Sequence, residues 1–442
     1  MAPPVRTAAL NAPAFLRATS GEVLGLVAIP SGSFWRKLFA FSGPGYLVAV
    51  GYMDPGNWAT GLAGGAAFGY QLLSVIILAN LVAMFLQVLA TKLGLVTGLD
   101  LAQACRHHYG RGTRLLLWVL CETAIIACDL AELLGAAIAL KFLFGMPLAI
   151  GVCLTVLEVL LILMLLRRGW RQLEAFIVAM MLVIALCFAV EIFIAAPRVG
   201  DLAMGLIPQT TIVTDPAMLY LAIGILGATV MPHNLYLHSS LVKTRRIDRT
   251  EKGLWEAVRY ARFDTIAALS LAILVNASIL ILAASTFHIS GITDLASIDQ
   301  AYQLLSPSVG VGFASTLFAV ALLASGQNSS ITGTLAGQIV MEGFTDLRWP
   351  SWLRRMVSRL VAMVPALAAI LVYGEGGATQ LLILSQVILS LQLPFAVYPL
   401  VRLTGSKKLM GSFVNRRTTN AVAWFLTGAI VIVNVVLIFN ML

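Results

Sequence analysis

Long apolar stretches, separated by short polar segments, run through almost the whole chain. A membrane-spanning helix needs about 20 largely apolar residues, and stretches of this kind occur at eleven places. They are residues 41–64, 71–96, 114–141, 147–166, 173–196, 217–241, 263–287, 310–341, 357–373, 376–401 and 419–440. The segments between them are too short for a separate soluble domain. The pattern therefore predicts an all-α, polytopic membrane protein.

The composition agrees with this prediction. Of the 442 residues, 60% are hydrophobic and only 11% are charged, whereas a soluble domain has about 25% charged residues. Mean hydropathy is +0.92. The five cysteines match no zinc or disulfide spacing, so we interpret them as small buried side chains. We expect no cofactor.

Basic residues alternate between the two ends of the predicted helices. They occupy segments 6–37, 106–114, 167–171, 243–262, 348–359 and 402–417, and only Lys141 and Arg198 fall on the opposite side. By the positive-inside rule, the amino terminus is cytoplasmic and the carboxyl terminus lies outside the inner (plasma) membrane. The net charge of +9 thus faces lipid headgroups, and we expect no nucleic acid. Residues 1–40, proline-rich and without a signal-peptide core, are predicted to form a cytoplasmic tail.

Two of the apolar stretches contain helix breakers. The first contains Asp54-Pro55-Gly56-Asn57 and the sixth contains Met231-Pro232-His233-Asn234, so both have the form x-Pro-x-Asn. Proline inside a helix costs about 3 kcal/mol. Each break opens a block of five stretches, which predicts two inverted repeats, 41–196 and 217–401, followed by an eleventh helix at 419–440. Paired broken helices at the membrane midplane are typical of secondary transporters.

The residues at the two breaks are suited to a metal cation. A carboxylate such as Asp54 costs about 2.5–3.5 kcal/mol in the membrane on insertion scales, so it needs a partner or a function. Asn57 and backbone carbonyls freed by the break add oxygen ligands. Met231 lies beside the freed carbonyl of Ala228, and its thioether favours transition ions over calcium or magnesium. Packing is the alternative interpretation of Met231.

Acidic residues in the third stretch indicate a proton route. Glu122, Asp129 and Glu132 are spaced by seven and three residues, which places them on one helix face. Such a face is costly unless the acids pass protons or pair with cations. Possible partners are Arg354, Arg355 and Arg359, and a static ion-pair cluster is the alternative.

We expect some of the other polar residues in the apolar stretches to belong to the functional site and the rest to hold helices together. His233, next to the second break, could bind metal or carry protons. We interpret His238 as a satisfied structural histidine. The polar run 325–334 mostly joins helices, whereas Gln386 is predicted to line the path.

Four sequence strings resemble the Nramp family of proton-coupled metal transporters, typified by bacterial manganese importers. They are Asp54–Asn57, Gly227–His233, Gly326–Gly337 and Ser385–Pro394, and the layout of eleven spans also fits. Asn328 stands where many relatives have serine, a difference that we do not expect to change the substrate.

The resemblance implies a fold similar to the leucine transporter. It also implies metal ligation by Asp54, Asn57, Met231 and the Ala228 carbonyl, with Gln386 joining in some states. Protons would move near Asp54, His233, Glu122, Asp129 and Glu132. Because relatives that carry aluminium or magnesium lack the methionine, manganese is the expected substrate, with iron, cadmium and cobalt as further candidates.

Three other functions are alternatives to metal transport. The main alternative is an amino-acid or other organic-substrate transporter of the same broken-helix fold. It would bind a carboxylate through Gly-rich backbone, whereas here a carboxylate and a thioether converge. An intramembrane enzyme lacks support, because the chain has no nucleophile–base pair and no His-Glu-x-x-His motif. A channel would be separated from a carrier by direct flux measurements. We expect a monomeric importer.

Overall fold

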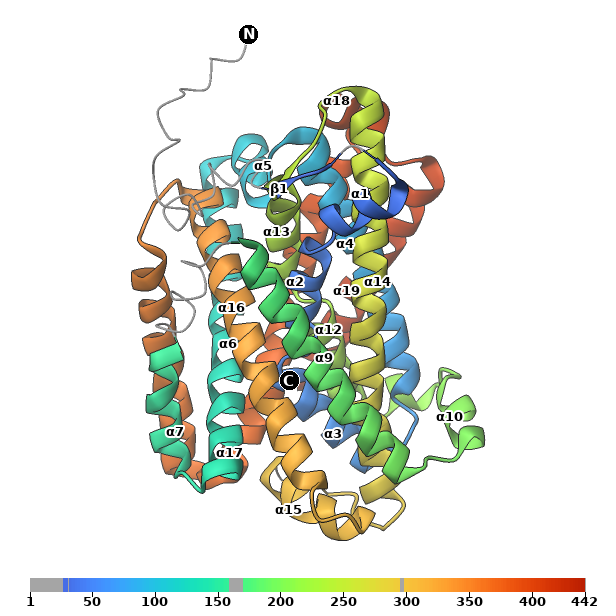
Figure 1. Cartoon of the computed structure of the whole chain (residues 1–442), viewed down its shortest axis with the longest axis vertical. Coiled ribbons are helices and arrows are strands. Elements are labelled where there is room, and N and C mark those ends of the chain that lie inside the picture. Colours follow the sequence, from blue (N-terminus) through green and yellow to red (C-terminus); the bar gives the residue numbers. More distant parts are fainter. Residues whose placement is uncertain (1–26, 31, 159–169, 295–297, 442) are drawn as a thin grey trace.

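The computed structural model describes residues 27–30, 32–158, 170–294 and 298–441, and these are almost entirely helical (Figure 1). Residues 1–26 of the expected tail and 159–166 of the fourth apolar stretch lie outside the described residues. In the first half the elements are β1 (Val27–Ala28), α1 (Phe34–Phe41), α2 (Pro44–Gly51), α3 (Pro55–Phe68), α4 (Leu73–Thr97), α5 (Leu101–His108), α6 (Arg111–Phe144), α7 (Leu148–Leu154), η2 (Thr155–Leu157) and α9 (Trp170–Ala195).

The second half begins with two short connecting helices. Its elements are α10 (Val199–Gly205), α11 (Thr211–Thr214), α12 (Pro216–Thr229), α13 (Pro232–Leu241), η3 (Val242–Thr244), β2 (Arg245–Arg246), α14 (Glu251–Ala283), η4 (Ala284–His288), α15 (Ile298–Val309), α16 (Ala314–Thr345), α17 (Ser351–Thr404), α18 (Lys407–Met410), η5 (Gly411–Phe413) and α19 (Arg417–Met441). The strands β1 and β2 form one short parallel pair.

Both predicted helix breaks are present, and proline has the same position in each. Pro55 is the first residue of α3, and Pro232 is the first residue of α13. This position suits proline, because the first turn of a helix has backbone N–H groups without intrahelical partners. Asp54 and Met231 precede the prolines with non-helical backbone dihedrals, their ψ angles being 161° and 118°. Each stretch thus forms two half-helices: α2 and α3, then α12 and α13.

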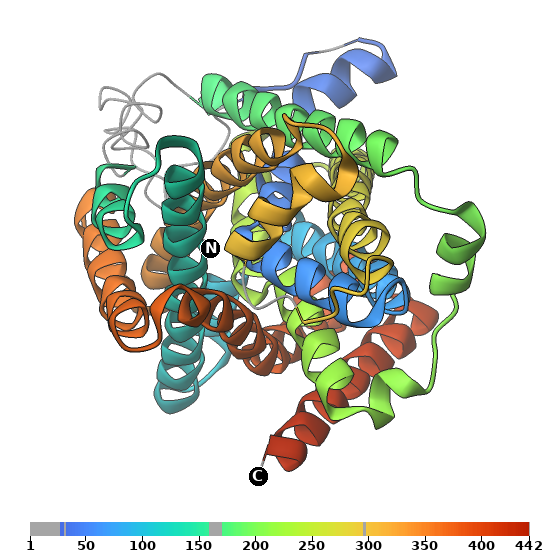
Figure 2. The same cartoon turned by 90° about the horizontal axis from the view of Figure 1, so that it is seen from below.

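The half-helices lie in the centre of the helix bundle. α3 packs against α12, and α2 packs against α13, so the two breaks face each other. Seen along the bundle, the blue ribbon of α2 and α3 is surrounded by other helices (Figure 2). α6 packs extensively against both α16 and α17. The core therefore encloses the breaks, away from the outer surface.

The apolar stretches correspond to helices, although not all are apolar enough to be recognised as spans. Among the described residues, eight helical segments are long and apolar enough to cross a membrane. The first stretch is divided into α2 and α3, and α16 carries the polar run 325–334. α17 bends at Gly374, where φ is 66°, so it contains both the ninth and the tenth stretch. The count of eleven spans stays a prediction.

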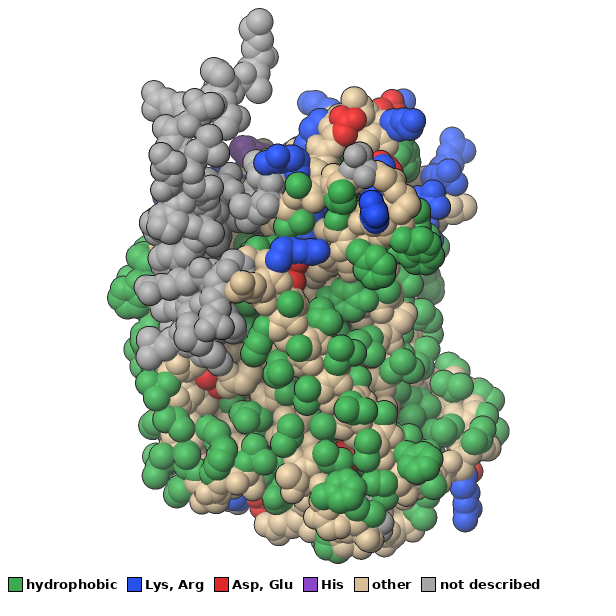
Figure 3. All heavy atoms as spheres, in the orientation of Figure 1, with side chains coloured by type: hydrophobic (Ala, Val, Ile, Leu, Met, Phe, Trp, Pro, Cys, Tyr) green, Lys and Arg blue, Asp and Glu red, His purple; other side chains and the backbone are tan. Residues whose placement is uncertain are grey.

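Charge and hydrophobicity are segregated along the molecule. Lysine and arginine side chains gather at the end that carries α5 and α18, and hydrophobic side chains cover the middle (Figures 1 and 3). This is the distribution that the alternating basic segments predict. We call this end of the molecule the basic end.

Candidate functional site

Asp54 and Asn57 from the first break meet Ala228 from the second break. Asp54 caps α3, and its Oδ1 accepts hydrogen bonds from the Asn57 backbone N at 2.9 Å and Nδ2 at 2.7 Å. The same Nδ2 donates to the Ala228 carbonyl at 3.0 Å. That carbonyl is near the end of α12, where the helix stops, so it lacks the backbone N–H that a further helical turn would supply. Two acceptor oxygens from opposite half-helices thus converge on one point.

This point is buried and retains unused acceptors. The side chain of Asp54 is 0% exposed, and its Oδ2 has no hydrogen-bond partner among the described residues. A half turn of the Asn57 amide would exchange its nitrogen for its oxygen. Carboxylate, amide and carbonyl oxygens would then surround the same point. Such a donor set suits a divalent cation.

Met231 lies at the second break, fully buried. It packs with Ala124, Cys128 and Leu389, and its sulfur accepts a hydrogen bond from Asn234 Nδ2 at 3.4 Å. Asn234 has the same position in the second break as Asn57 has in the first. The thioether therefore has a packing role in this structure, and it remains next to a break whose other donors are oxygens.

Gln386 reaches the first break from α17. A side-chain carbon added to Gly56 would collide with the Gln386 amide, so Gly56 allows the two segments to approach closely. Gln386 Nε2 donates to Ser385 Oγ at 2.9 Å, and its Oε1 has no partner among the described residues. The predicted lining residue thus lies beside the helix break.

Other backbone carbonyls of the first break already have partners. The Tyr52 carbonyl accepts from Asn276 Nδ2 at 2.8 Å, and the Met53 carbonyl accepts from Trp58 Nε1 at 3.2 Å and from Ser325 Oγ. Ser325, in the polar run of α16, thus joins helices as predicted. These contacts satisfy backbone groups that a bilayer cannot hydrate, and they hold the break in shape.

The predicted acidic face of α6 is paired with arginines at the start of α17. Arg354 binds Glu122 at 2.8 Å. Arg355 binds Glu132 at 2.8 Å and also pairs with Asp129. Asp129, Glu132 and Arg355 are each 1% exposed or less. The expected partners are therefore confirmed as neighbours, and the contacts by themselves fit both the proton route and the static ion-pair cluster.

The ion-pair network approaches the candidate metal site through Cys128. Cys128 belongs to the same buried cluster as Met231, and its Sγ lies 3.6 Å from Glu132 Oε1. At the other end of the face, the Glu122 side chain is 21% exposed. The ten residues between Glu122 and Glu132 span about 15 Å along the helix. Titratable groups thus extend from the surface towards the breaks.

The two buried histidines differ in their contacts. His238 Nδ1 lies 3.0 Å from Gln87 Oε1, and Gln87 in turn donates to the Tyr52 hydroxyl at 2.7 Å. This contact agrees with a structural histidine, but the prediction that His238 is satisfied holds only for Nδ1, because its Nε2 has no hydrogen-bond partner among the described residues. His233 is 2% exposed, and its Nδ1 has no partner within the described chain.

One charged residue in this network was not anticipated. Glu158 pairs with Arg359 and accepts hydrogen bonds from Gln327 at 2.7 Å and Ser330 at 3.2 Å. An acidic residue in the apolar stretch 147–166 carries the same signal as Asp54, so the sequence could have indicated it.

A second unanticipated cluster joins helices at the basic end of the molecule. Arg245 Nη2 binds Glu174 at 2.7 Å and the Ser42 carbonyl at 2.8 Å. Asp264 accepts from Ser42 Oγ at 2.9 Å and from the Gly45 backbone N at 2.6 Å. The segment between α1 and α2 is thereby tied to α9, β2 and α14.

No described group of three His, Cys, Asp or Glu side chains could hold a metal ion. A metal site at the breaks would therefore depend on mixed donors, namely one carboxylate, amides, a carbonyl and a thioether. This donor set differs from that of a structural zinc site, which is built from Cys and His.

Comparison with known proteins identifies close relatives along the chain. Residues 45–440 match the family described as "Natural resistance-associated macrophage protein-like". The divalent metal cation transporter MntH of Bradyrhizobium diazoefficiens is 58% identical over 418 residues, which cover 94% of this chain and 93% of the relative. MntH of Listeria welshimeri is 54% identical over 432 residues, covering 98% and 95%.

Solved structures agree with these relatives. The Eremococcus coleocola manganese transporter, in complex with an aromatic bis-isothiourea substituted compound, has a TM-score of 0.87 and 43% identity, covering 96% of this chain and 90% of that one. Mhp1, a nucleobase-cation-symport-1 family transporter, has a TM-score of 0.59 at 16% identity, covering 90% and 92%. The latter similarity concerns the fold alone and confirms the predicted transporter architecture.

Proposed function

Because this chain belongs to the natural resistance-associated macrophage protein-like family, and is thus a multi-pass membrane transporter rather than an enzyme, we propose that it imports divalent transition metal ions together with protons. Manganese is the preferred substrate, with iron, cadmium and cobalt as further substrates. The convergence of Asp54 Oδ1 and the Ala228 carbonyl on one buried point carries this proposal. The names of the relatives support the substrate class.

The proposed metal ligands are Asp54, Asn57, Met231, Gln386 and the Ala228 carbonyl. Asp54 supplies the negative charge that a divalent cation needs in a low-dielectric site. The thioether provides selectivity against calcium and magnesium, which bind oxygen. Pro55, Gly56 and Pro232 keep the helices broken, so that backbone oxygens are exposed to the ion.

The proposed proton route uses the acidic face of α6. Glu122, Asp129 and Glu132 would exchange protons, and Arg354 and Arg355 would compensate their charge. His233 would connect this route with the region near Asp54. A route separate from the metal ligands lets protons cross while the ion occupies the site.

We also propose how the helices move and how the chain lies in the membrane. Two five-helix repeats, 41–196 and 217–401, would move relative to each other about the breaks, in alternating access. The eleventh helix at 419–440 lies outside the repeats. The chain would act as a monomer in the cell inner (plasma) membrane. The tail, residues 1–40, would be cytoplasmic and the carboxyl terminus outside.

The test is manganese uptake into proteoliposomes, with and without an inward pH gradient. We expect the gradient to increase uptake by the unchanged protein. Asp54→Asn should reduce manganese affinity by at least about 100-fold, beyond the 10- to 100-fold that loss of an outer-shell group causes. Asparagine is also a good N-cap, so the fold should persist.

Asp215→Asn is the matched control. Asp215 also caps a helix and precedes a proline, and it accepts a hydrogen bond from the Met218 backbone N at 2.9 Å. It lies outside the breaks. If Asp54→Asn and Asp215→Asn bind manganese with equal affinity, the metal site lies elsewhere. If the pH gradient does not change uptake, transport is not coupled to protons.

A further inference from the structure

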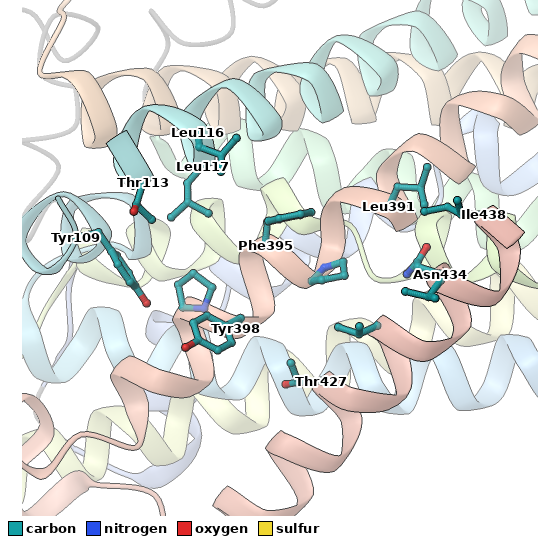
Figure 4. A pocket seen from close by; sticks show the side chains of 14 residues that line it. Tyr109, Thr113, Leu116, Leu117, Leu391, Phe395, Tyr398, Thr427, Asn434 and Ile438 are labelled. Carbon is teal, nitrogen blue, oxygen red and sulfur yellow. The ribbon is translucent and has the colours of Figure 1, made fainter. Parts of the chain in front are cut away.

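A cavity of about 500 Å³ lies between α6, the second half of α17 and α19 (Figure 4). It is outside the proposed metal site and proton route. Its walls are almost wholly apolar, with Leu117 on one side and Phe395 and Val431 on the others. The volume lies within the roughly 300–1,000 Å³ of small-molecule sites. Its chemistry fits a hydrocarbon chain.

The cavity opens to the outer surface of the helix bundle. Phe395 is 41% exposed and Val435 is 43% exposed, and both line it. In a multi-pass membrane protein these side chains face the bilayer, where they are surrounded by lipid acyl chains. An elongated apolar molecule could therefore enter from the side.

One end of the cavity is cationic. Tyr109 lines the cavity, and the guanidinium of Arg402 lies 5.4 Å from the centre of the Tyr109 ring. Arg402 follows the lining residue Tyr398 by four residues, which places it on the same face of α17. Arg402 is exposed, and no described carboxylate forms an ion pair with it. It belongs to the basic end of the molecule, where lipid headgroups would lie.

We propose that this cavity binds one anionic phospholipid. Its acyl chain occupies the space between α6, α17 and α19, and its phosphate group is held at Arg402 beside Tyr109. The apolar walls and the single cationic end match an amphiphile with a negative head, and basic pockets between membrane helices bind such headgroups. The site depends on the membrane setting and is independent of the transported ion.

The first test fills the cavity. Val435→Trp would occupy the space of the acyl chain, whereas Val436→Trp alters a neighbouring residue of α19, 39% exposed, that does not line the cavity. Native mass spectrometry of detergent-purified protein should show one fewer retained phospholipid in Val435→Trp than in the parent and in Val436→Trp. An unchanged lipid count in Val435→Trp would overturn the proposal.

The second test concerns the headgroup and does not depend on the tryptophan variant folding. Occupancy by phosphatidylglycerol should exceed that by phosphatidylcholine about fivefold, the ratio that one basic side chain near an anionic lipid provides. Arg402→Gln should lose this preference. Arg262→Gln, which alters an exposed arginine of α14, should keep it. Equal occupancy by the two lipids in the parent, or a second copy of the chain covering this face instead of lipid, would contradict the proposal.

Discussion

The residues at the two breaks contribute differently to the proposed metal binding and selectivity. Asp54 provides charge, which any divalent cation requires, and Asn57 and Ala228 provide oxygen, which calcium and magnesium accept equally well. Among the proposed ligands, only Met231 is soft. Substitution of Met231 therefore tests discrimination between metals separately from metal binding itself.

We expect Met231→Ala to retain measurable manganese transport and to gain transport of, or competition by, calcium or magnesium. Cadmium, the softest of the candidate ions, should lose the most affinity, on the order of 10- to 100-fold. Isothermal titration calorimetry and competition in proteoliposomes measure both effects.

Met218→Ala controls for the loss of a buried methionine. Met218 is 3% exposed and lies in α12, in a separate apolar cluster. Truncation of a buried methionine costs about 2–5 kcal/mol of stability in either variant. If Met231→Ala excludes calcium and magnesium as well as the parent does, the thioether serves packing alone, and selectivity comes from cavity size or dehydration.

At the scale of elements, α6 and the first half of α17 are held together by buried ion pairs. Arg355 contacts both Asp129 and Glu132, so either acid can lose its charge while the arginine keeps a partner. Breaking a buried pair by removing one partner costs about 3–5 kcal/mol. Shared partners of this kind allow a proton to bind one acid without leaving an isolated buried charge.

Glu132→Gln should weaken proton movement and the pH dependence of uptake. Manganese affinity should change by less than about tenfold, or 1.4 kcal/mol, because Glu132 is not a proposed ligand. A pH-sensitive dye inside proteoliposomes and calorimetry would measure the two quantities.

Glu191→Gln is the comparison variant. Glu191 is also buried, in α9, and its two carboxylate oxygens have no hydrogen-bond partner within the described residues. It lies outside the ion-pair network and should keep normal proton movement. Unchanged proton movement in Glu132→Gln as well would support the static ion-pair cluster.

At the scale of the whole molecule, a cluster of polar contacts joins helices at the basic end. Asp264 and Arg245 hold the segment before α2 against α9 and α14, while Leu47 of α2 is 0% exposed. In the proposed alternating access each end of the protein opens in turn, so these contacts would have to break and re-form.

Asp264→Ala removes the acceptor for the Ser42 hydroxyl and the Gly45 N–H, and buried donors left unsatisfied cost about 1–3 kcal/mol. We expect α2 to move more readily, so that a cysteine introduced at Leu47 reacts faster with a maleimide. The background would carry Cys153→Ser, since Cys153 is an exposed cysteine.

Glu256→Gln is the matched control for Asp264→Ala. It breaks an exposed pair with Lys37, 2.7 Å apart, at the same end of the molecule, and such pairs contribute about 0–1 kcal/mol. It should leave the labelling rate unchanged. Equal rates in the Asp264→Ala variant and the parent would show that these contacts do not limit opening.

The orientation of the chain is a second property of the whole molecule. The alternating basic segments and the predicted eleven spans predict that the carboxyl terminus lies outside. A reporter that is active only in the cytoplasm should therefore stay silent when fused after Leu442, and the same reporter fused before Met1 should be active. Strong activity at the carboxyl terminus would require an even number of spans.

Local chemistry made much of this protein predictable from its sequence. Apolar stretches long enough for a bilayer determine helices, and proline in a helix has local steric consequences, so both breaks were anticipated at the correct residues. The acids of α6 and the arginines of α17 were expected to pair, because isolated charges are costly in the membrane. The described structure confirms these neighbours.

Only the tertiary structure decided which distant groups meet. Asn57 and the Ala228 carbonyl are 171 residues apart, and the contacts of Arg245, Glu174 and Asp264 depend on how the helices pack. Span counting from hydropathy was least certain at α16, whose buried polar run faces other helices instead of lipid. Sequence determines which residues must avoid lipid or find partners, and the packing of the helices determines which partners they find, because burial and hydrogen bonding depend on distances in space.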